Sequence, residues 1–263
     1  MVVELNDLSC GYAGHAVLRN LCFSMRSGEA VCILGSNGIG KTTLFKTLLR
    51  FIKPISGSIH IDGNDIMQMD QAQLSQFFSY VPQAKESMGN YTVQDMVLMG
   101  RARYIRKFSL PSKEDYNAAN IALGQLALTN YRDRNYRTLS GGEQQMVLLA
   151  RAIAQNARFI LLDEPASNLD FKNQERLLRA IMQLTSQGIG ILMVSHSPDH
   201  ALSCCDNSLL ISKDGTYIFG PSNDVITADN LQKIYDTKML VVEGKTNSEQ
   251  TFKTCCLQLG GKI

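Results

Sequence analysis

The sequence predicts an α/β protein whose parallel sheet is covered by helices, and three observations lead to this fold class. After Ser140, helix-period segments alternate with short apolar strands, as they do in parallel sheets with crossover helices. A glycine-rich turn joins the apolar segment 30–35 to an amphipathic segment that begins at Lys41. Over residues 85–137 the pattern becomes largely helical, which indicates an inserted helical part.

The elements follow in chain order. We expect strands over 2–8, 21–25, 30–35 and 57–63, a helix over 41–52, and a further strand over 77–82. Thr92 and Asp95 have the spacing of a capping box and predict a helix over 93–101, followed by another over 112–128. Helices over 143–155 and 173–188 and strands over 159–165 and 190–196 complete the core. We expect one domain over 1–240, with the insertion at 85–137, and a short tail over 241–263.

Composition limits the class of protein. The chain has 263 residues, of which 44% are hydrophobic and 19% charged, so we expect a globular fold. A formal net charge of +2 is too small to indicate a nucleic-acid partner. No apolar run reaches the roughly 18 residues of a membrane span, and the N-terminus does not resemble a signal peptide. We therefore expect a cytoplasmic protein that reaches a membrane only through a partner.

The seven cysteines do not predict a metal site. Cys22 and Cys32 lie in apolar strand segments, where cysteine usually serves as a small buried hydrophobe. The adjacent pairs at 204–205 and 255–256 lack the C-x-x-C spacing of zinc and redox sites.

"GSNGIGKTT", residues 35–43, fits the phosphate-loop pattern G-x-x-x-x-G-K-[ST] and stands between a strand and a helix, as that loop requires. Its glycines let the backbone approach a phosphate, Lys41 neutralises β- and γ-phosphate charge, and the Thr42 hydroxyl is suited to Mg²⁺. The expected nucleotide contacts are Gly35, Ser36, Asn37, Gly38, Ile39, Gly40, Lys41, Thr42 and Thr43.

Polar residues end or follow three apolar strands. Asp163 ends "FILLD" at the carboxyl edge of the sheet, where α/β proteins bind ligands, and it is suited to hold Mg²⁺. Glu164 is suited to act as general base toward water. His196 follows "GILMVS" and Gln83 follows "YVP", so they can reach the γ-phosphate and the metal or water, respectively. Each signal is weak alone, but together with Lys41 they predict a hydrolytic nucleotide site.

A second helix start has the features of an anion site. Ser140 and Glu143 have capping-box spacing, and the predicted buried stripe of this helix is Met146, Leu149, Ala150 and Ile153. Gly141 and Gly142 each cost up to ~1 kcal/mol in a helix relative to alanine. Two glycines at this place make sense if a phosphate must approach the backbone closely. Because the chain has one lysine loop and two such helix starts, we predict that two copies of the chain complete each other's sites.

Together these residues resemble the ATP-binding subunit of an ABC transporter, over nearly the whole chain to about Val242. "GSNGIGKTT" resembles the Walker A loop, "LSGGEQQ" the signature motif and "FILLDEP" the Walker B strand; Gln83 resembles the Q-loop, "SNLD" the D-loop and "SHSPDHA" the His-loop. The resemblance implies a P-loop NTPase core with an antiparallel β subdomain and an inserted α-helical subdomain.

The resemblance also implies roles and partners. It implies that Lys41, Thr42, Gln83 and Asp163 serve phosphates and Mg²⁺, that Glu164 and His196 serve hydrolysis, that Tyr12 stacks on adenine, and that Ser140, Gly141 and Gly142 close on ATP held by a second copy. The implied partners are that second copy, integral membrane permease subunits contacted by Gln83 and the insertion, and indirectly a substrate-binding protein. The implied location is peripheral, on the cytoplasmic face of the membrane.

Within the family, residues 91–128 and 219–242 resemble importers of iron chelates, haem, cobalamin or related metal compounds. The cluster "RARYIRK", residues 101–107, is either a solvated helix rim, a docking face or a membrane-surface patch. The alternative function is a soluble ABC ATPase in nucleic-acid repair or translation. The short insertion, the cysteine spacing and the near-neutral charge argue against that alternative.

Overall fold

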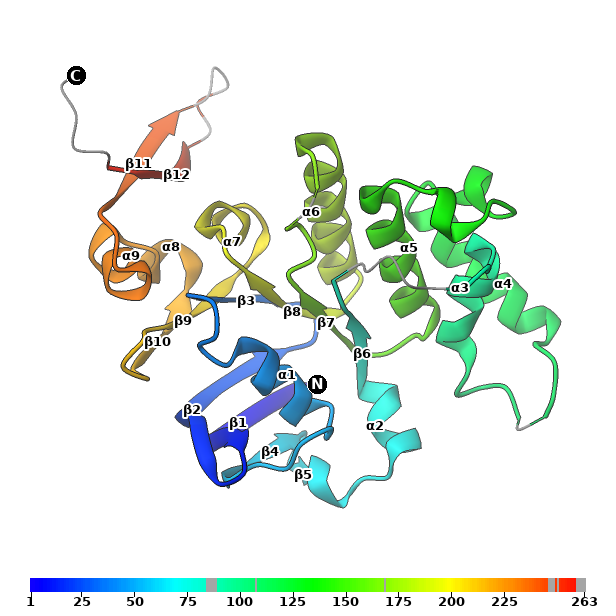
Figure 1. The fold of residues 1–263 in the computed structure, drawn as a ribbon, viewed down its shortest axis with the longest axis horizontal. Coiled ribbons are helices and arrows are strands. Elements are labelled where there is room, and N and C mark those ends of the chain that lie inside the picture. Colours follow the sequence, from blue (N-terminus) through cyan, green and yellow to red (C-terminus); the bar gives the residue numbers. More distant parts are fainter. Residues whose placement is uncertain (84–88, 107, 168, 246–248, 250, 259–263) are drawn as a thin grey trace. The chain divides into compact units, whose positions relative to one another are not determined.

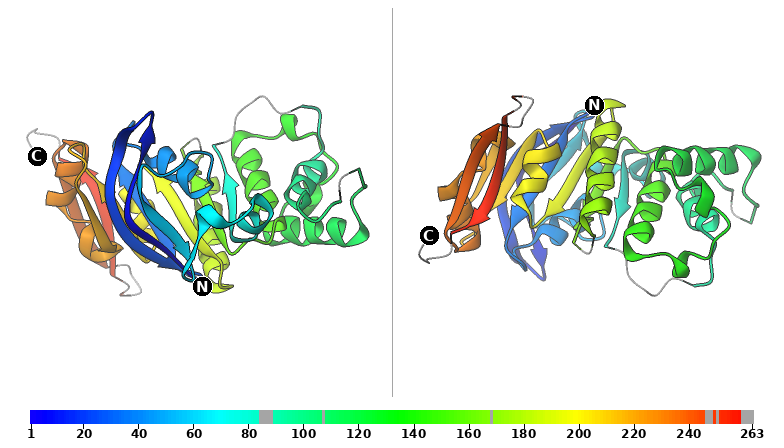
Figure 2. Two further views of the ribbon diagram at one scale, coloured as in Figure 1. Left: turned by 90° about the horizontal axis from the view of Figure 1, so that it is seen from below. Right: turned by 90° about the horizontal axis from the view of Figure 1, so that it is seen from above.

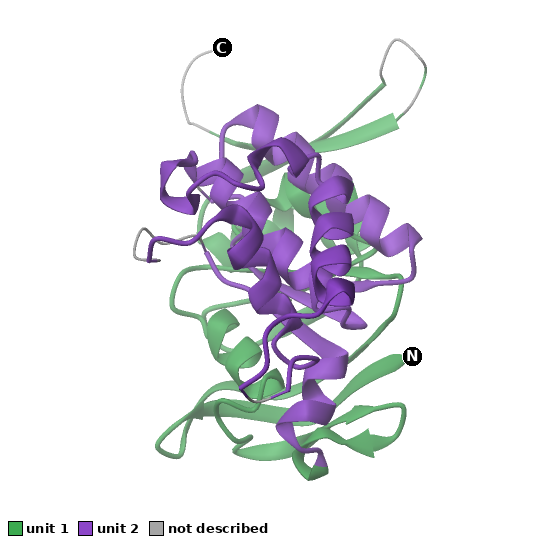
Figure 3. Ribbon diagram, turned by 90° about the vertical axis from the view of Figure 1, so that its right-hand side faces the viewer, with its two compact units in different colours: residues 1–68, 192–263 green, residues 69–191 purple. Residues whose placement is uncertain are grey.

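The computed structural model describes residues 1–83, 89–106, 108–167, 169–245, 249 and 251–258. The chain divides into two compact units (Figure 3): unit 1 comprises residues 1–68 and 192–263, and unit 2 comprises residues 69–191. Unit 1 is therefore built from both ends of the sequence. The expected insertion boundaries at 85 and 137 and the domain end at 240 stay predictions, and the first residues of the insertion, 85–88, lie outside the described part.

Unit 1 contains an antiparallel sheet. Its strands are β1 (Val2–Tyr12), β2 (His15–Arg26), β4 (Ser56–Ile61) and β5 (Asn64–Asp65), in the order β2-β1-β4-β5. The long strands β1 and β2 lie side by side (Figure 2, dark blue). Alternate residues of β2, such as Leu21 and Phe23, are buried, as expected for a sheet with one covered face. The same alternation exposes Cys22, so the predicted burial of this cysteine was wrong.

A second sheet of unit 1 carries the candidate site. The central strand β3 (Ala30–Gly35) is buried at every residue and pairs in parallel with β9 (Asn207–Ile211), which pairs antiparallel with β10 (Tyr217–Pro221). Strand β8 (Gly190–Ser195) is the other neighbour of β3. Continuous burial of a parallel strand requires covering elements on both faces.

The helices of unit 1 are α1 (Lys41–Leu48), α7 (Pro198–Cys204), α8 (Ser222–Val225) and α9 (Ala228–Tyr235), with a 3₁₀ turn at Ile66–Gln68. After α9 the chain forms a hairpin of β11 (Met239–Lys245) and β12 (Thr251–Leu257) (Figure 1). Regular structure therefore continues past residue 240.

Unit 2 combines two parallel strands with a group of helices. Strands β6 (Phe78–Val81) and β7 (Phe159–Asp163) pair in parallel, and β8, which starts in this unit at Gly190, is the next strand after β7. The helices are α2 (Gln71–Phe77), α3 (Val93–Leu98), α4 (Lys113–Gln125), α5 (Gly141–Ala154) and α6 (Phe171–Ser186), with 3₁₀ turns at Met99–Arg101, Thr129–Tyr131 and Tyr136–Thr138. Helices α3, α4 and α5 pack on one another (Figure 1, green). Among the described residues, no helix has the length and hydropathy of a membrane span.

The capping signals in the sequence mark the starts of two helices correctly. The capping boxes predicted at Thr92 and at Ser140 are both formed, and α3 and α5 begin directly after them. Helix α2 was not expected, although Asp70 and Gln73 form the same reciprocal box at its start.

The helix predicted over 112–128 ends early, at Gln125, and the helix predicted over 41–52 is also too long. The segment expected to be helical to residue 52 ends at Leu48, because Arg50 adopts a left-handed conformation with φ 58°. The backbone N–H of Phe51 then donates to the Lys46 carbonyl at 2.8 Å, which is the closing hydrogen bond of a Schellman motif. This position usually holds glycine, so the sequence carried no stop signal.

Candidate active site

The glycine-rich loop of unit 1 connects β3 to α1. Gly38 and Gly40 have φ values of 78° and 106°, in the left-handed region that favours glycine. A Cβ at Gly40 would also lie 2.8 Å from the Val17 side chain. Gly40 is the N-cap of α1 and supplies no side-chain cap, so the first N–H groups of the helix have no capping side chain and suit an anion.

Lys41 points back into this loop. Its ammonium group donates to the carbonyl oxygens of Gly35 at 2.7 Å and Ser36 at 2.9 Å, and the residue is only 5% exposed. Burial of a cation is costly unless it is paired or hydrogen-bonded, and here the loop backbone supplies acceptors. A phosphate oxygen entering the loop would give the same ammonium a charge-assisted hydrogen bond, which is stronger than one to a neutral carbonyl.

Tyr12 lies beside the helix that the loop opens. Lys46 of α1 donates to the Tyr12 hydroxyl at 3.3 Å, and its ammonium lies 5.8 Å from the ring centroid. The tyrosine is 47% exposed, so part of its ring is accessible to a flat partner. Unit 1 thus brings Tyr12 and the phosphate loop to the same helix, whereas Lys46 was not expected to take part.

His196 directly follows β8 in unit 1 and is exposed. Its carbonyl oxygen accepts a hydrogen bond from the Tyr235 hydroxyl at 3.2 Å. The preceding Ser195 hydroxyl is hydrogen-bonded to Nδ1 of His200 at 3.0 Å and accepts the Ser197 N–H at 3.1 Å. Burial lowers the pKa of His200, and the nearby Asp199 opposes that effect.

The acidic residues lie in unit 2, at the end of β7. Asp163 accepts a hydrogen bond from the Tyr80 hydroxyl at 3.1 Å, and the parallel pairing of β6 with β7 places Tyr80 opposite Leu161. Burial, and then the charge of Asp163, raise the pKa of Tyr80, so the tyrosine remains a neutral donor. Tyr80 was not among the expected site residues, because a tyrosine in an apolar strand usually indicates core.

Glu164 adopts a left-handed conformation with φ 49°, which is uncommon for a residue with a side chain and concentrates at functional sites. Its carbonyl oxygen accepts hydrogen bonds from the hydroxyl of Ser167 at 3.0 Å and its N–H at 3.3 Å. The Gln83 amide in turn donates to the Ser167 hydroxyl at 2.7 Å. Unit 2 therefore links Gln83 to the backbone of Glu164 through a serine that was not expected to take part.

The start of α5 in unit 2 carries the serine and the two glycines. The Ser140 side chain accepts the Glu143 N–H at 3.3 Å, and the Glu143 carboxylate accepts the Ser140 N–H at 2.8 Å. Burial raises the pKa of Glu143, but the hydrogen bonds from Ser140 and Tyr131 and the charge of Arg134 together leave the pKa lowered. The box serves the N–H of Glu143, and the N–H groups of Gly141 and Gly142 precede it in the same first turn.

The two glycines differ in their surroundings. A Cβ at Gly142 would lie 2.5 Å from the amide nitrogen of Asn173 in α6, whereas a Cβ at Gly141 would meet nothing within 4 Å. Close packing against Asn173 therefore explains Gly142 without a ligand. Gly141 has open space and no left-handed backbone, so it is the glycine whose presence the fold of the described residues leaves unexplained.

Most of the predicted buried stripe of α5 is confirmed. Met146, Leu149 and Ala150 are buried, but Ile153 is only half-buried and lines a hollow on unit 2. The predicted D-loop after β7 ends at Asp170. This residue caps α6 by accepting the Asn173 N–H at 2.8 Å. Asn168 in the same loop lies outside the described residues.

Comparison with known proteins identifies the family. Residues 18–167 match the family model described as ABC transporter. An ABC transporter ATP-binding protein of Haemophilus influenzae, described as uncharacterized, is 39% identical over 90% of each chain. The chain belongs to the ABC transporter family. The molybdate import ATP-binding protein MolC of Haemophilus influenzae is 34% identical, over 92% of this chain and 90% of that one. The "Probable iron chelatin transport ATP-binding protein" of Helicobacter pylori is 33% identical, over 91% and 94%.

The fold comparison agrees. A solved structure described as an inward-facing, metal-chelate type ABC transporter superimposes with a TM-score of 0.88 and 32% identity, covering 98% of both chains. The expected ABC ATPase fold is therefore confirmed. As an ABC ATPase, the chain is an ATP hydrolase coupled to transport, which favours this class over a nucleic-acid repair or translation factor.

The predicted site residues of this ABC ATPase fall into two sets, each assembled within its own unit. Unit 1 holds Tyr12, His196 and the loop 35–43, and unit 2 holds Gln83, the acidic pair and the start of α5.

Proposed function

We propose that the chain powers import of a metal-containing compound, such as an iron chelate, haem or cobalamin, through separate membrane permease subunits. The single observation that carries the nucleotide role is the buried Lys41 ammonium inside a left-handed glycine loop at the start of α1. The substrate class is supported by the names of the relatives, which include molybdate, iron chelatin and metal-chelate systems.

In this proposal the residues of unit 1 grip ATP. The loop N–H groups and Lys41 bind the β- and γ-phosphates, and Tyr12 stacks on the adenine. Base-on-aromatic stacking is worth about 1–3 kcal/mol and tolerates any base, so Tyr12 contributes affinity more than selectivity. His196 contacts the γ-phosphate.

The residues of unit 2 act on water and on the metal. Gln83 and Asp163 offer an amide oxygen and a carboxylate, which are oxygen donors that suit Mg²⁺. The Thr42 hydroxyl of the phosphate loop is an oxygen donor of the same kind. When bound, Mg²⁺ neutralises charge on the phosphate oxygens. Tyr80 orients the Asp163 carboxylate by its hydrogen bond, and Glu164 removes a proton from the attacking water.

We infer further that two copies of the chain share each ATP. The first turn of α5 offers N–H groups and the positive end of a helix dipole, which suit a terminal phosphate. Gly141 leaves that approach open. ATP binding then joins the copies, hydrolysis separates them, and the permease subunits respond to that cycle.

Glu164→Gln tests the hydrolytic assignment. The amide keeps the size of the side chain but does not accept the proton, so we expect ATP binding near the parent affinity and a loss of turnover of about 100-fold or more. Equilibrium binding of a fluorescent ATP analogue and phosphate release measure the two effects separately. Turnover at the parent rate would remove Glu164 from the role of base.

The partner surface that we propose for the permease subunits is a hollow on unit 2 of about 500 Å³. Its lining includes Ala118, Ile121, Ala122 and Ile153, with Arg101 and Arg158 among the polar residues. Ile121 is 60% exposed. Apolar contacts next to arginine are typical of protein interfaces, so the surface suits a permease segment with an apolar face and an acidic group.

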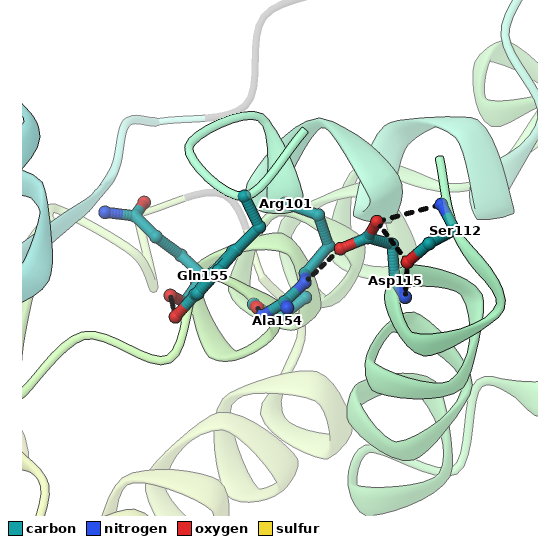
Figure 4. Close-up of polar contacts among 6 residues, drawn as sticks. Arg101, Ser112, Asp115, Ala154 and Gln155 are labelled. Atoms are coloured by element: carbon teal, nitrogen blue, oxygen red, sulfur yellow. Dashed lines mark hydrogen bonds and ion pairs between the residues drawn. The ribbon is translucent and has the colours of Figure 1, made fainter. Parts of the chain in front are cut away.

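A buried ion pair stiffens this surface (Figure 4). Arg101 Nε lies 3.1 Å from Asp115, and its guanidinium also donates to the Ala154 carbonyl at 3.0 Å. Asp115 accepts hydrogen bonds from the Ser112 N–H at 2.9 Å and the Ser112 hydroxyl at 2.8 Å. These two hydrogen bonds are the largest causes that lower the pKa of Asp115. The pair ties together the turn after α3, the start of α4 and the end of α5. Arg101 therefore has a structural role within the basic cluster, and Lys107 of that cluster lies outside the described residues.

Ile121→Glu tests the partner surface. We expect the purified variant to hydrolyse ATP within about twofold of the parent rate but to lose co-purification with its permease subunits, because a charge would be buried in an apolar contact. Ile218→Glu is the matched control, since Ile218 is an exposed isoleucine of unit 1. Equal recovery of the permease with both variants would move the contact elsewhere. Peripheral attachment to the cytoplasmic face of the membrane follows from this contact.

A further inference from the structure

The C-terminal part of unit 1 reaches the loop that carries His196. Tyr235, the last residue of α9, donates its hydroxyl hydrogen to the carbonyl oxygen of His196 at 3.2 Å. This contact spans 39 positions of sequence. The hydroxyl therefore fixes the backbone of the residue whose side chain is assigned to the γ-phosphate.

The helix that carries Tyr235 also lies against the strand that leads into the phosphate loop. Helix α9 packs against β3, the strand that ends at Gly35. Burial raises the pKa of Tyr235, and a hydrogen bond from the backbone of Gly35 acts in the opposite direction. The Gly35 carbonyl is in turn an acceptor for the Lys41 ammonium at 2.7 Å. Tyr235 thus joins the His196 backbone to a helix that packs on the strand leading into the phosphate loop.

A second contact fixes the helix that follows His196. The Asp199 carboxylate, in the first turn of α7, accepts the Cys255 N–H at 2.8 Å and the Thr254 hydroxyl at 3.0 Å from β12. The hairpin therefore packs on α7 through hydrogen bonds to a charged acceptor, which are stronger than neutral ones. Helix α9 therefore holds the His196 loop, and the hairpin holds α7, the helix that follows this loop.

We propose that Tyr235 is a positioning residue for ATP hydrolysis, which holds the backbone of the His196 loop. The proposal rests on the proposed role of His196 at the γ-phosphate. Tyr235 itself acts only through the backbone of His196. The segment after α7 is thereby part of the hydrolytic machinery, although the family model ends at residue 167.

Tyr235→Phe tests the proposal, because it removes one oxygen and keeps the ring. We expect kcat for ATP to fall about three- to tenfold, the range that one lost hydrogen bond gives, while KM for ATP stays within about twofold. The matched control is Tyr217→Phe, whose hydroxyl also bonds backbone groups of unit 1, at Asn20 and Cys22. This control should leave kcat unchanged. A kcat for Tyr235→Phe equal to that of Tyr217→Phe would overturn the proposal.

A double-mutant cycle separates positioning from loss of packing. If Tyr235 acts through His196, adding Tyr235→Phe to His196→Ala should change single-turnover hydrolysis by less than about twofold, because coupled residues are non-additive. Losses that multiply in the double variant would show that Tyr235 acts independently and would overturn the proposal. Glu164→Gln, measured in parallel, reports on the proposed function alone: an inactive Glu164→Gln beside a parent-like Tyr235→Phe rejects only the positioning role.

Discussion

At the scale of single residues, two tyrosine hydroxyls of unit 2 have opposite surroundings. The Tyr80 hydroxyl donates to Asp163 at 3.1 Å, whereas the Tyr136 hydroxyl is buried with no hydrogen-bond partner among the described residues. Burial is the main cause that raises the pKa of both. A buried hydroxyl with a partner stabilises its acceptor, and one without a partner lowers the stability of the fold.

The metal assignment is therefore testable at Tyr80. Tyr80→Phe should raise the Mg²⁺ concentration for half-maximal ATPase activity about 10-fold or more, because residues that orient a ligand typically contribute this much to metal affinity. Magnesium titration of the steady-state rate measures the shift. Tyr136→Phe is the control, with an unchanged magnesium dependence and an equal or higher melting temperature. The same magnesium dependence for both variants would show that the Tyr80 hydroxyl does not orient a metal ligand.

At the scale of elements, the first turn of α5 contains one glycine that packing explains and one that we assign to function. Gly142 lies against Asn173, and Gly141 faces open space. Alanine is up to about 1 kcal/mol better than glycine inside a helix, but overpacking costs about 1–3 kcal/mol. The two positions should therefore respond to the same substitution in opposite directions.

Gly142→Ala should lower the unfolding free energy by about 1 kcal/mol, since the clash with Asn173 exceeds the helix gain. Gly141→Ala should leave that free energy unchanged or raise it, yet reduce ATPase activity because a methyl group would obstruct the phosphate. Urea denaturation and phosphate release measure the two properties. Parent activity in Gly141→Ala would show that no phosphate approaches this turn.

The sequence predicted the features that depend on neighbouring residues better than those that depend on residues far apart in the chain. Capping boxes and the phosphate loop are local patterns, so their positions were predicted well. The end of α1 was not, because Arg50 takes a conformation usually left to glycine. Tyr80, Ser167 and Tyr235 were missed because their partners are 83, 84 and 39 positions distant, and no local pattern records such contacts.

At the scale of the whole molecule, each unit carries only part of the proposed set of catalytic groups. Unit 1 supplies the lysine loop and His196, and unit 2 supplies the acidic strand end and the first turn of α5. We propose that the first turn of α5 binds ATP that is held by another copy. We therefore expect two chains to dimerise around bound ATP. Blocking the first turn of α5 should leave ATP binding intact but prevent dimerisation.

Light scattering with ATP and Mg²⁺ on two variants tests this most directly. Glu164→Gln, which we expect to bind ATP with little hydrolysis, should have about twice the mass of the 29.1 kDa chain. Adding Gly141→Asp should return the mass to 29.1 kDa with ATP still bound, because the carboxylate is favourable at a helix start but repels a triphosphate. A pair that forms equally well with the aspartate present, or a Glu164→Gln variant that stays single with ATP bound, would contradict the shared site.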